Sequence, residues 1–546
     1  MRKHRWRVVG ALALVIAGLA FLSWLTARPE APSAAQPPLA SGAPAQAEGA
    51  AAFIGSGFGG ISTEALESSA IPWKLAAAAL VLDERRRDPT SAIDQATLRR
   101  VLTRFGFLFP SAIANLPPGV SMPPSAFPLG MTHGMLAPLG GSSVEVANIG
   151  CAACHAGIAY DASGRPRPDV AVLGAPNSSL DLEAYTQAIF VALRRHRRDD
   201  LLAAAGTLFP EMGQRERLTL RWLVFPLVQR RMSALAHQNR PMPFPNGSPG
   251  LTNGVAALKA RLGTPLAGGG PQDDGAVSIP GLADRVWRTS FLADGAYAPP
   301  NARSGPTVAA QIDPAHLRAL AAITTFFTVP SMGVRPGKAI GALDESEAIF
   351  TWLKDLRLQP FPGTIDSSAA DRGAGLYERE CASCHGSYRE QYGRSVMATF
   401  PNWIGDVGTD PLRAKLFDEP LAKAVRASSY RDLISVRTGR GYAAPPLAGV
   451  WSTAPYLHNG SVPTLAALLD PERRPQRFMV GGHSLDFESG GIRLAADGRY
   501  SAASRPTSAP VWYDTRKAGR ANRGHRYGET LNPDEQRALI EFLKRL

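Results

Sequence analysis

The four cysteines of this 546-residue chain are the feature that most constrains its fold. They form two matching patterns, Cys151-Ala152-Ala153-Cys154-His155 and Cys381-Ala382-Ser383-Cys384-His385. In Cys-x-x-Cys-His, two thiols one short turn apart can each bond to a haem vinyl group, and the adjacent histidine lies beneath the iron as its proximal ligand. The sequence therefore predicts two covalently bound c-type haems, attached through Cys151, Cys154, Cys381 and Cys384 and ligated by His155 and His385.

Other uses of the four cysteines explain the pattern less well. Two disulfides would leave the histidine after each pair unexplained, in a chain that has only 10 histidines. A zinc ribbon usually separates its cysteine pairs by about 15–20 residues, whereas residues 155–380 separate them here. A thioredoxin-like pair requires neither the histidine nor a second copy.

The N-terminus has the pattern of an export signal. A basic start, Met1–Arg7, precedes an apolar run at 8–25 that is close to the shortest length able to span a membrane. Residues 1–27 are therefore either a cleaved signal peptide or an uncleaved membrane anchor, and both alternatives stay open. Both place the body of the protein in the periplasm or on the extracellular face. Residues 28–60 are rich in Ala and Pro and are predicted to be a linker, with the folded part starting near Ile61.

Composition limits the class of protein and its partners. With 45% hydrophobic and 19% charged residues, the chain is neither disordered nor a multi-span membrane protein. Its net charge of +13 (59 basic minus 46 acidic residues) favours acidic partners or anionic lipid headgroups, with solubility alone as the alternative. Nucleic acid is not an expected partner beyond the export barrier.

The length predicts more than one domain, and each haem should have its own. A Gly- and Pro-rich stretch at 330–341 is the best boundary, which gives an N-terminal haem domain with insertions at 61–335 and a C-terminal cytochrome c domain at 336–546. No useful alternating strand pattern is visible. The predicted fold class is therefore mainly α, with two cytochrome c-like haem domains and long loops.

Apolar periodicity locates the expected helices. They fall at 98–109, 180–193, 218–235, 344–356, 369–380 and 533–546. The last has a clear start, because Asn532 can cap it, Pro533 suits its first turn and Glu535 completes a capping box. A helix before the second haem motif that crosses a C-terminal helix is the cytochrome c plan, and Gly373 would allow their close packing.

The two haem motifs in one exported chain resemble the bacterial di-haem cytochrome c peroxidase superfamily. Several segments are most similar to its rubber oxygenase branch, namely 454–465 (APYLHNGSVPTL), 408–411 (GTDP), 474–475 (RP) and 522–528 (NRGHRYG), with a looser match at 174–177 (GAPN). The resemblance covers roughly residues 100–546 and is strongest in the second half.

The sixth ligand of each iron decides its chemistry, because an open face can bind oxygen or peroxide. His525 lies in a Gly-flanked loop just before the final helix, and the resemblance implies a histidine there as the distal ligand of the second haem. His458, His483 and Tyr527 are alternatives. No distal ligand can be named for the first haem. His133, Met131, Met135 and His196, the last within the basic run 194–198, are each better explained by packing or surface roles.

These assignments predict an enzyme whose first haem activates oxygen or peroxide and whose second haem transfers electrons. Resemblance also implies that Trp287 lies near both haems and helps electrons pass between them, although a core role is the simpler alternative. A rubber-oxygenase-like enzyme would cleave an apolar substrate, and a peroxidase would take electrons from a donor protein. The other hypothesis is a non-catalytic electron-transfer cytochrome with two six-coordinate haems.

Overall fold

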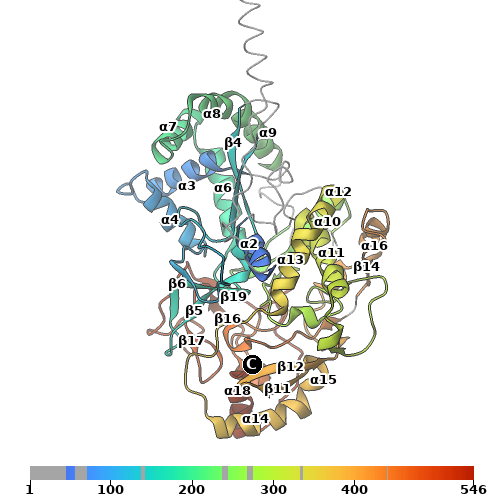
Figure 1. The fold of residues 1–546 in the computed structure, drawn as a ribbon. Coiled ribbons are helices and arrows are strands. Elements are labelled where there is room, and N and C mark those ends of the chain that lie inside the picture. The colour runs from blue at the N-terminus through green and yellow to red at the C-terminus, as the bar shows by residue number, and fades with distance from the viewer. Residues whose placement is uncertain are drawn as a thin grey trace, which may run out of the picture.

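The computed structural model describes residues 45–55, 71–136, 142–236, 244–266, 275–331, 336–439 and 441–546 (Figure 1). The predicted signal or anchor at 1–27 and the expected fold start near Ile61 lie outside these residues. Within them, no helix is long and apolar enough to cross a membrane.

The prediction of a mainly α fold is wrong. Helix makes up 41% and strand 16% of the described residues, so the fold is mixed α and β. The strands are short, and several pair residues far apart in the chain, as β9 (Tyr297–Ala298) does with β14 (Ser435–Val436). A two-residue strand shows no alternation of apolar and polar residues, and for this reason the sequence pattern missed it.

A helical lobe forms the upper end of the molecule in Figure 1. It contains α3 (Trp73–Arg87), α4 (Gln95–Arg104), α6 (Leu182–Arg195), α7 (Arg198–Leu208), α8 (Gln214–Thr219), the π-helical turn η3 (Leu220–Val224) and α9 (Phe225–Ala236). The helix α3 is buried at its centre and packs against α4, α6 and α7. The helices expected at 98–109, 180–193 and 218–235 are confirmed in this lobe, although α4 already ends at Arg104.

Two small sheets connect this lobe to the first haem motif. The first has the order β1-β4-β3, from β1 (Ile71–Pro72), β4 (Val144–Ile149) and β3 (Met131–Leu136). The motif itself forms α5 (Cys151–His155), which leads into the second sheet, with the order β2-β6-β5, from β2 (Ala112–Ile113), β6 (Pro166–Leu173) and β5 (Ala156–Tyr160).

The middle of the molecule contains a second group of helices. It consists of α2 (Ala45–Gly55), α10 (Gly254–Leu262), α11 (Pro314–Ser331), α12 (Pro336–Ala339) and α13 (Leu343–Lys354), with the short turns η4 (Arg285–Trp287), η5 (Ala309–Gln311) and η6 (Ile340–Ala342) and the strands β7 (Leu251–Thr252), β8 (Val277–Ser278) and β10 (Thr307–Val308). The helix α2 lies within the segment predicted to be a linker. It is buried against α13, where the rings of Phe53 and Trp352 are 4.9 Å apart.

The second haem motif lies between two crossing helices at the lower end of Figure 1. They are α14 (Ser367–Glu380), which precedes the motif helix α15 (Ala382–His385), and α18 (Pro533–Leu543). At Gly373 a Cβ atom would lie 2.0 Å from the carbonyl oxygen of Ala538, so only glycine allows the two helices to approach this closely. The crossing, the helix start and the Asn532–Glu535 capping box are confirmed.

The rest of the C-terminal half consists of short elements around this crossing. They are β11 (Ser387–Gln391), β12 (Arg394–Phe400), β13 (Ile404–Gly405), η7 (Ala414–Leu416), α16 (Glu419–Arg426), β15 (Tyr442–Ala443), η8 (Val450–Ser452), α17 (Leu465–Leu469), η9 (Pro471–Arg473), β16 (Arg477–Val480), β17 (Leu485–Asp486), β18 (Gly491–Ile492) and β19 (Val511–Asp514). Because β12 also pairs with β10, and β14 with β9, the two predicted haem halves share sheets.

Candidate functional site

Each Cys-x-x-Cys-His motif forms a single helical turn, α5 in the first half and α15 in the second. All four cysteines are free thiols, so the alternative of two disulfides finds no support. One helical turn places both cysteines and the histidine of a motif side by side, as attachment to one haem requires.

The two proximal histidines are held in the same way. Nδ1 of His155 lies 3.0 Å from the carbonyl oxygen of Pro280, and Nδ1 of His385 lies 2.8 Å from that of Pro445. A proton on Nδ1 leaves the Nε2 lone pair for a metal. Burial lowers the pKa of His155 to about 4 and also lowers that of His385, so both rings are neutral near pH 7.

The motif analysis did not find these carbonyl acceptors. They belong to similar segments, Pro280-Gly281-Leu282 and Pro445-Pro446-Leu447, one after each motif. Because Pro249-Gly250-Leu251 also follows the first motif, the Pro-x-Leu pattern alone does not identify the acceptor, and only the fold shows which proline is used.

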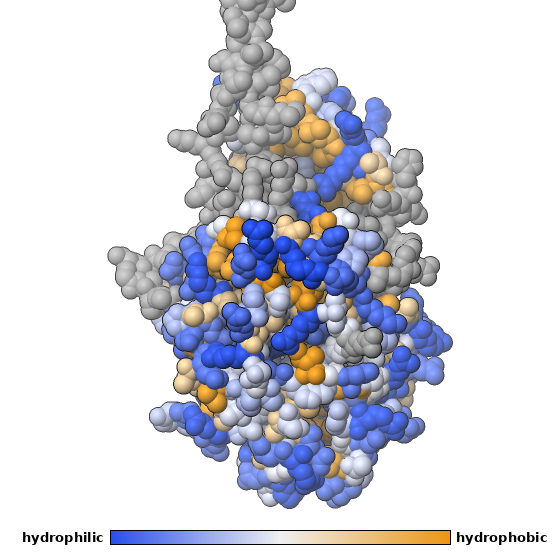
Figure 2. Space-filling model, turned by 90° about the vertical axis from the view of Figure 1, so that its right-hand side faces the viewer, coloured by the Kyte–Doolittle hydropathy of each residue, from blue (hydrophilic) through white to orange (hydrophobic). Residues whose placement is uncertain are grey.

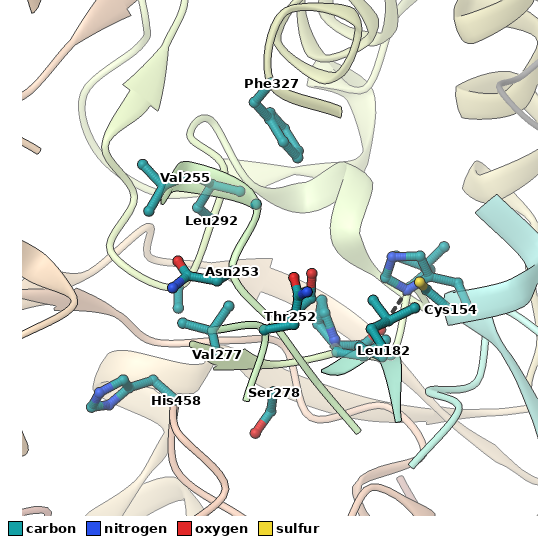
Figure 3. Close-up of a pocket in the computed structure, with 18 of the residues that line it drawn as sticks. Cys154, Leu182, Thr252, Asn253, Val255, Val277, Ser278, Leu292, Phe327 and His458 are labelled. Carbon is teal, nitrogen blue, oxygen red and sulfur yellow. Dashed lines mark hydrogen bonds between the residues drawn. The ribbon is translucent and has the colours of Figure 1, made fainter. Parts of the chain in front are cut away.

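Both motifs line one mostly apolar cavity of about 1190 Å³. Four histidines border it among the described residues, His155, His385, His458 and His525. Figure 3 shows part of this cavity, with Cys154 and Leu182 on one side and His458 on the other. Because all four cysteines border this cavity, two haems attached to them would lie next to each other in it.

His525 faces the second proximal histidine. The ring centres of His385 and His525 are 6.2 Å apart. Two imidazole nitrogens that share one metal ion at about 2 Å each place their ring centres roughly 6 Å apart. Burial lowers the pKa of His525 to about 4, and its Nδ1 is buried without a hydrogen-bond partner. The residues present therefore fit an iron between these two rings.

The loop that carries His525 is fixed from two sides. The Arg474 guanidinium donates hydrogen bonds to the carbonyl oxygens of Asn522 (2.6 Å), Gly524 (2.7 Å) and His525 (3.2 Å). On the other side, a Cβ atom at Gly524 would lie 2.3 Å from the backbone of Gly408. The 408–411, 474–475 and 522–528 segments are thus brought together around this loop.

Near the first motif, the described residues place no corresponding histidine ring. Among the described residues, no second histidine ring contacts His155 in the way that His525 contacts His385. His133 instead binds Glu145 (3.2 Å) and contacts Phe127, and Nε2 of His196 binds Asp83 (3.0 Å). Met131 lies in the core of the helical lobe, and Met135 follows it along β3.

The other residues considered as ligands of the second haem make different contacts. His458 borders the cavity but stacks on Tyr442, with ring centres 3.9 Å apart. His483 is buried, and neither ring nitrogen has a side-chain partner in the described residues. Tyr527 contacts the edge of the His525 ring at 5.2 Å between ring centres.

Buried arginines beside the cavity were not found from the sequence. Arg285 and Arg288 border it, and their side chains donate to the carbonyl oxygens of Gly281 (2.7 Å) and Leu292 (3.0 Å). Neither makes an ion pair with a described carboxylate, and burial lowers their pKa to about 10 and about 9. Asp284 and Asp294 lie close enough to raise the pKa of Arg285 and Arg288, respectively, and the carboxylates of a bound haem would add to this compensation.

Trp287 lies in the core between the two motif regions. It is 9% exposed and belongs to a cluster that includes Ala152 of the first motif and Met397 and Phe400 of β12. Next to it, Asp284 and Arg285 lie near Tyr388, whose hydroxyl accepts a bond from the Leu447 amide (2.8 Å). The role of Trp287 in electron transfer stays a prediction.

The comparisons agree with this reading of the second half. Residues 441–479 match the family model described as "RoxA-like, cytochrome c-like". This segment contains Pro445, His458 and Arg474, so it spans the support of one proximal histidine and the clamp on the His525 loop. A cytochrome c-like domain implies a c-type haem, and the match supports a haem-binding cytochrome of the rubber oxygenase type.

Two relatives come from Sinorhizobium fredii. The chain is similar to the uncharacterized protein y4iM, with 30% identity over 32% of this chain and 45% of that protein. It is also similar to the uncharacterized protein y4iJ, with 26% identity over 34% of this chain and 40% of that protein. The chain thus spans less than half the length of either relative.

Proposed function

We propose that this chain is an exported di-haem c-type cytochrome that acts as an oxygenase of the rubber oxygenase type. The first haem would be the reactive one and the second would transfer or store electrons, with an apolar molecule as substrate. When bound, a haem with an open face supplies oxygen or peroxide activation. The RoxA-like match favours oxygen and an oxygenase over a peroxidase served by a donor protein.

The observation that carries this proposal is the difference between the two proximal histidines. His385 has a second imidazole 6.2 Å away, whereas the described surroundings of His155 hold no such partner. Apolar side chains, among them Leu182, Ile189 and Phe190, border the cavity on the side of the first motif. These residues exclude water and leave room for an apolar substrate.

Carbon monoxide binding to the reduced full chain tests the proposal, because only an open or labile iron takes it up. We expect two haems and about one bound carbon monoxide per chain. The variant Cys151→Ala/Cys154→Ala should lose one haem, carbon monoxide uptake and oxygen consumption. The matched variant Cys381→Ala/Cys384→Ala should also lose one haem but keep the carbon monoxide. Uptake that disappears only in the second variant would assign the reactive iron to the other half.

A further inference from the structure

The helical lobe carries an exposed apolar stripe that no other described element covers. Trp222 is 59% exposed, Leu227 50% and Leu218 46%. Figure 2 shows apolar residues gathered at the upper end of the molecule, next to hydrophilic ones. Soluble proteins seldom expose large apolar side chains in a group without a binding role.

The stripe follows the outer face of α8, η3 and α9. Five exposed residues recur along it every three or four positions, as residues on one helix face do. They are Arg215, Leu218, Trp222, Pro226 and Arg230. The opposite face is buried, with Thr219, Leu220 and Val224 turned into the lobe. The apolar centre of the outer face is therefore bounded by an arginine at each end.

Positive charge surrounds this stripe. Residues 214–236 contain five arginines and one acidic residue, a net charge of +4 (5 − 1). The acidic residue, Glu216, is bound to Lys74 at 2.8 Å and turned inward. The guanidinium groups of Arg198 and Arg221 lie 5.0 and 5.3 Å from the Trp222 ring, and both contact the carboxylate of Asp199, at 3.6 and 2.9 Å. The positive charge that can meet a partner is therefore mainly that of the other arginines of 214–236. Arg198 ends the basic run 194–198, which is thus brought next to the stripe.

The stripe also adjoins the cavity that the two Cys-x-x-Cys-His motifs line. Leu227 is half exposed and at the same time borders the cavity, together with Val224, Val228 and Arg231 of the same helical segment. One face of α9 is therefore exposed, and the adjacent face lines the cavity.

We propose that the outer face of α8, η3 and α9 docks on an anionic phospholipid surface. An amphipathic helix with tryptophan and leucine at its centre and arginines at its edges binds at the lipid headgroups, where the apolar side chains enter the acyl boundary and the arginines meet phosphate. Docking in this way places Leu227, which is half exposed and also lines the cavity, against the lipid. Apolar molecules dissolved in the lipid then reach the cavity without crossing water.

Hydrogen exchange of the full chain with and without vesicles tests this, because it locates the contact even if the N-terminal apolar run also binds. We expect vesicles of phosphatidylglycerol and phosphatidylcholine to slow exchange about tenfold in peptides from 214–231, and vesicles of phosphatidylcholine alone to have little effect. The variant Leu218→Ser/Trp222→Ser should lose this protection, and Arg215→Gln/Arg230→Gln should weaken it. Tyr392→Ser, at a 95% exposed position on the β11–β12 turn, should keep it.

Two results would overturn the proposal. The first is vesicle binding by the chain without any slowing of exchange at 214–231. The second is full protection in Leu218→Ser/Trp222→Ser together with loss in Arg215→Gln/Arg230→Gln. That second pattern would mean a purely electrostatic surface, as expected for an acidic protein partner instead of lipid.

Discussion

The two Cys-x-x-Cys-His motifs share their local structure and differ in what the rest of the chain places around them. In each, a one-turn helix precedes a histidine whose Nδ1 meets a proline carbonyl. That carbonyl comes 60 residues after His385 but 125 residues after His155. The longer insertion of the first half contains α6 to α10, and side chains of α6, α9 and α10 line the cavity.

The same difference extends to the opposite side of each histidine. The second half presents His525 on a loop fixed by Arg474 and Gly408. Around the first motif, the described cavity lining is mostly apolar. The five-residue motifs are thus alike, and the residues around them come from segments far away in the chain.

Removing His525 should have the largest effect on the difference between the two motifs. In His525→Gly we expect carbon monoxide uptake to rise from about one to about two per chain and the low-spin signal of the second haem to disappear. Absorption and electron paramagnetic resonance spectra measure both effects. The control His458→Gln alters another histidine at the cavity and should change neither. An unaltered low-spin signal in His525→Gly would show that His525 is only a loop residue.

A weaker change loosens the loop and keeps the ligand. Arg474→Ala removes hydrogen bonds to three carbonyl groups of the loop, so His525 should dissociate more readily from the second haem. We expect partial carbon monoxide uptake at that haem, measured as a second, slower binding phase. Arg473→Ala, at an exposed position next to it, should resemble the unaltered protein. A single phase of unchanged amplitude in Arg474→Ala would contradict the clamp.

Charge near the first motif should separate the two reduction potentials. Burial is the main cause of the lowered pKa of His155, and the positive charge of Arg285 adds to it, so the two groups are near each other. A buried cation favours the reduced haem, and Arg285→Gln should therefore lower the potential of the first haem by tens of millivolts, on the order expected for tuning by local charge. Potentiometric titration measures the shift, with Arg389→Gln on the exposed strand β11 as the control. A larger shift at the second haem would assign Arg285 to the wrong half.

The smallest expected effect concerns Asp284, between the two halves. Burial raises its pKa to about 6, so the folded protein keeps a proton that the unfolded chain releases between about pH 4 and 6. The free energy of unfolding should therefore fall as the pH rises through this window, by roughly 3 kcal/mol, since one pKa unit corresponds to about 1.4 kcal/mol. Asp284→Asn should flatten that part of the pH profile in urea unfolding, and the exposed Asp497→Asn should not. A profile that stays as steep in Asp284→Asn would exclude this carboxyl as the cause.

The sequence by itself determined the local features. The two Cys-x-x-Cys-His turns, the capping box at Asn532 and the close crossing at Gly373 depend on neighbouring residues or on one helix period, and these were predictable. Short-range hydrogen bonds and helical spacing fix such features before any tertiary contact forms.

Only the tertiary structure decided the features that depend on distant segments. Two-residue strands such as β9 exist because a distant segment pairs with them, as Ser435 pairs with Ala298. The Ser435 hydroxyl also donates a hydrogen bond to the Ala298 carbonyl, across 137 residues of sequence. The Ala-rich helix α2 has the composition of a linker, yet in the fold it is buried against α13. By residue type, Arg285 and Arg288 would be expected at the surface, yet the fold places both beside the cavity. The physical reason is that burial and strand pairing belong to contacts between segments, which no local pattern of residues records.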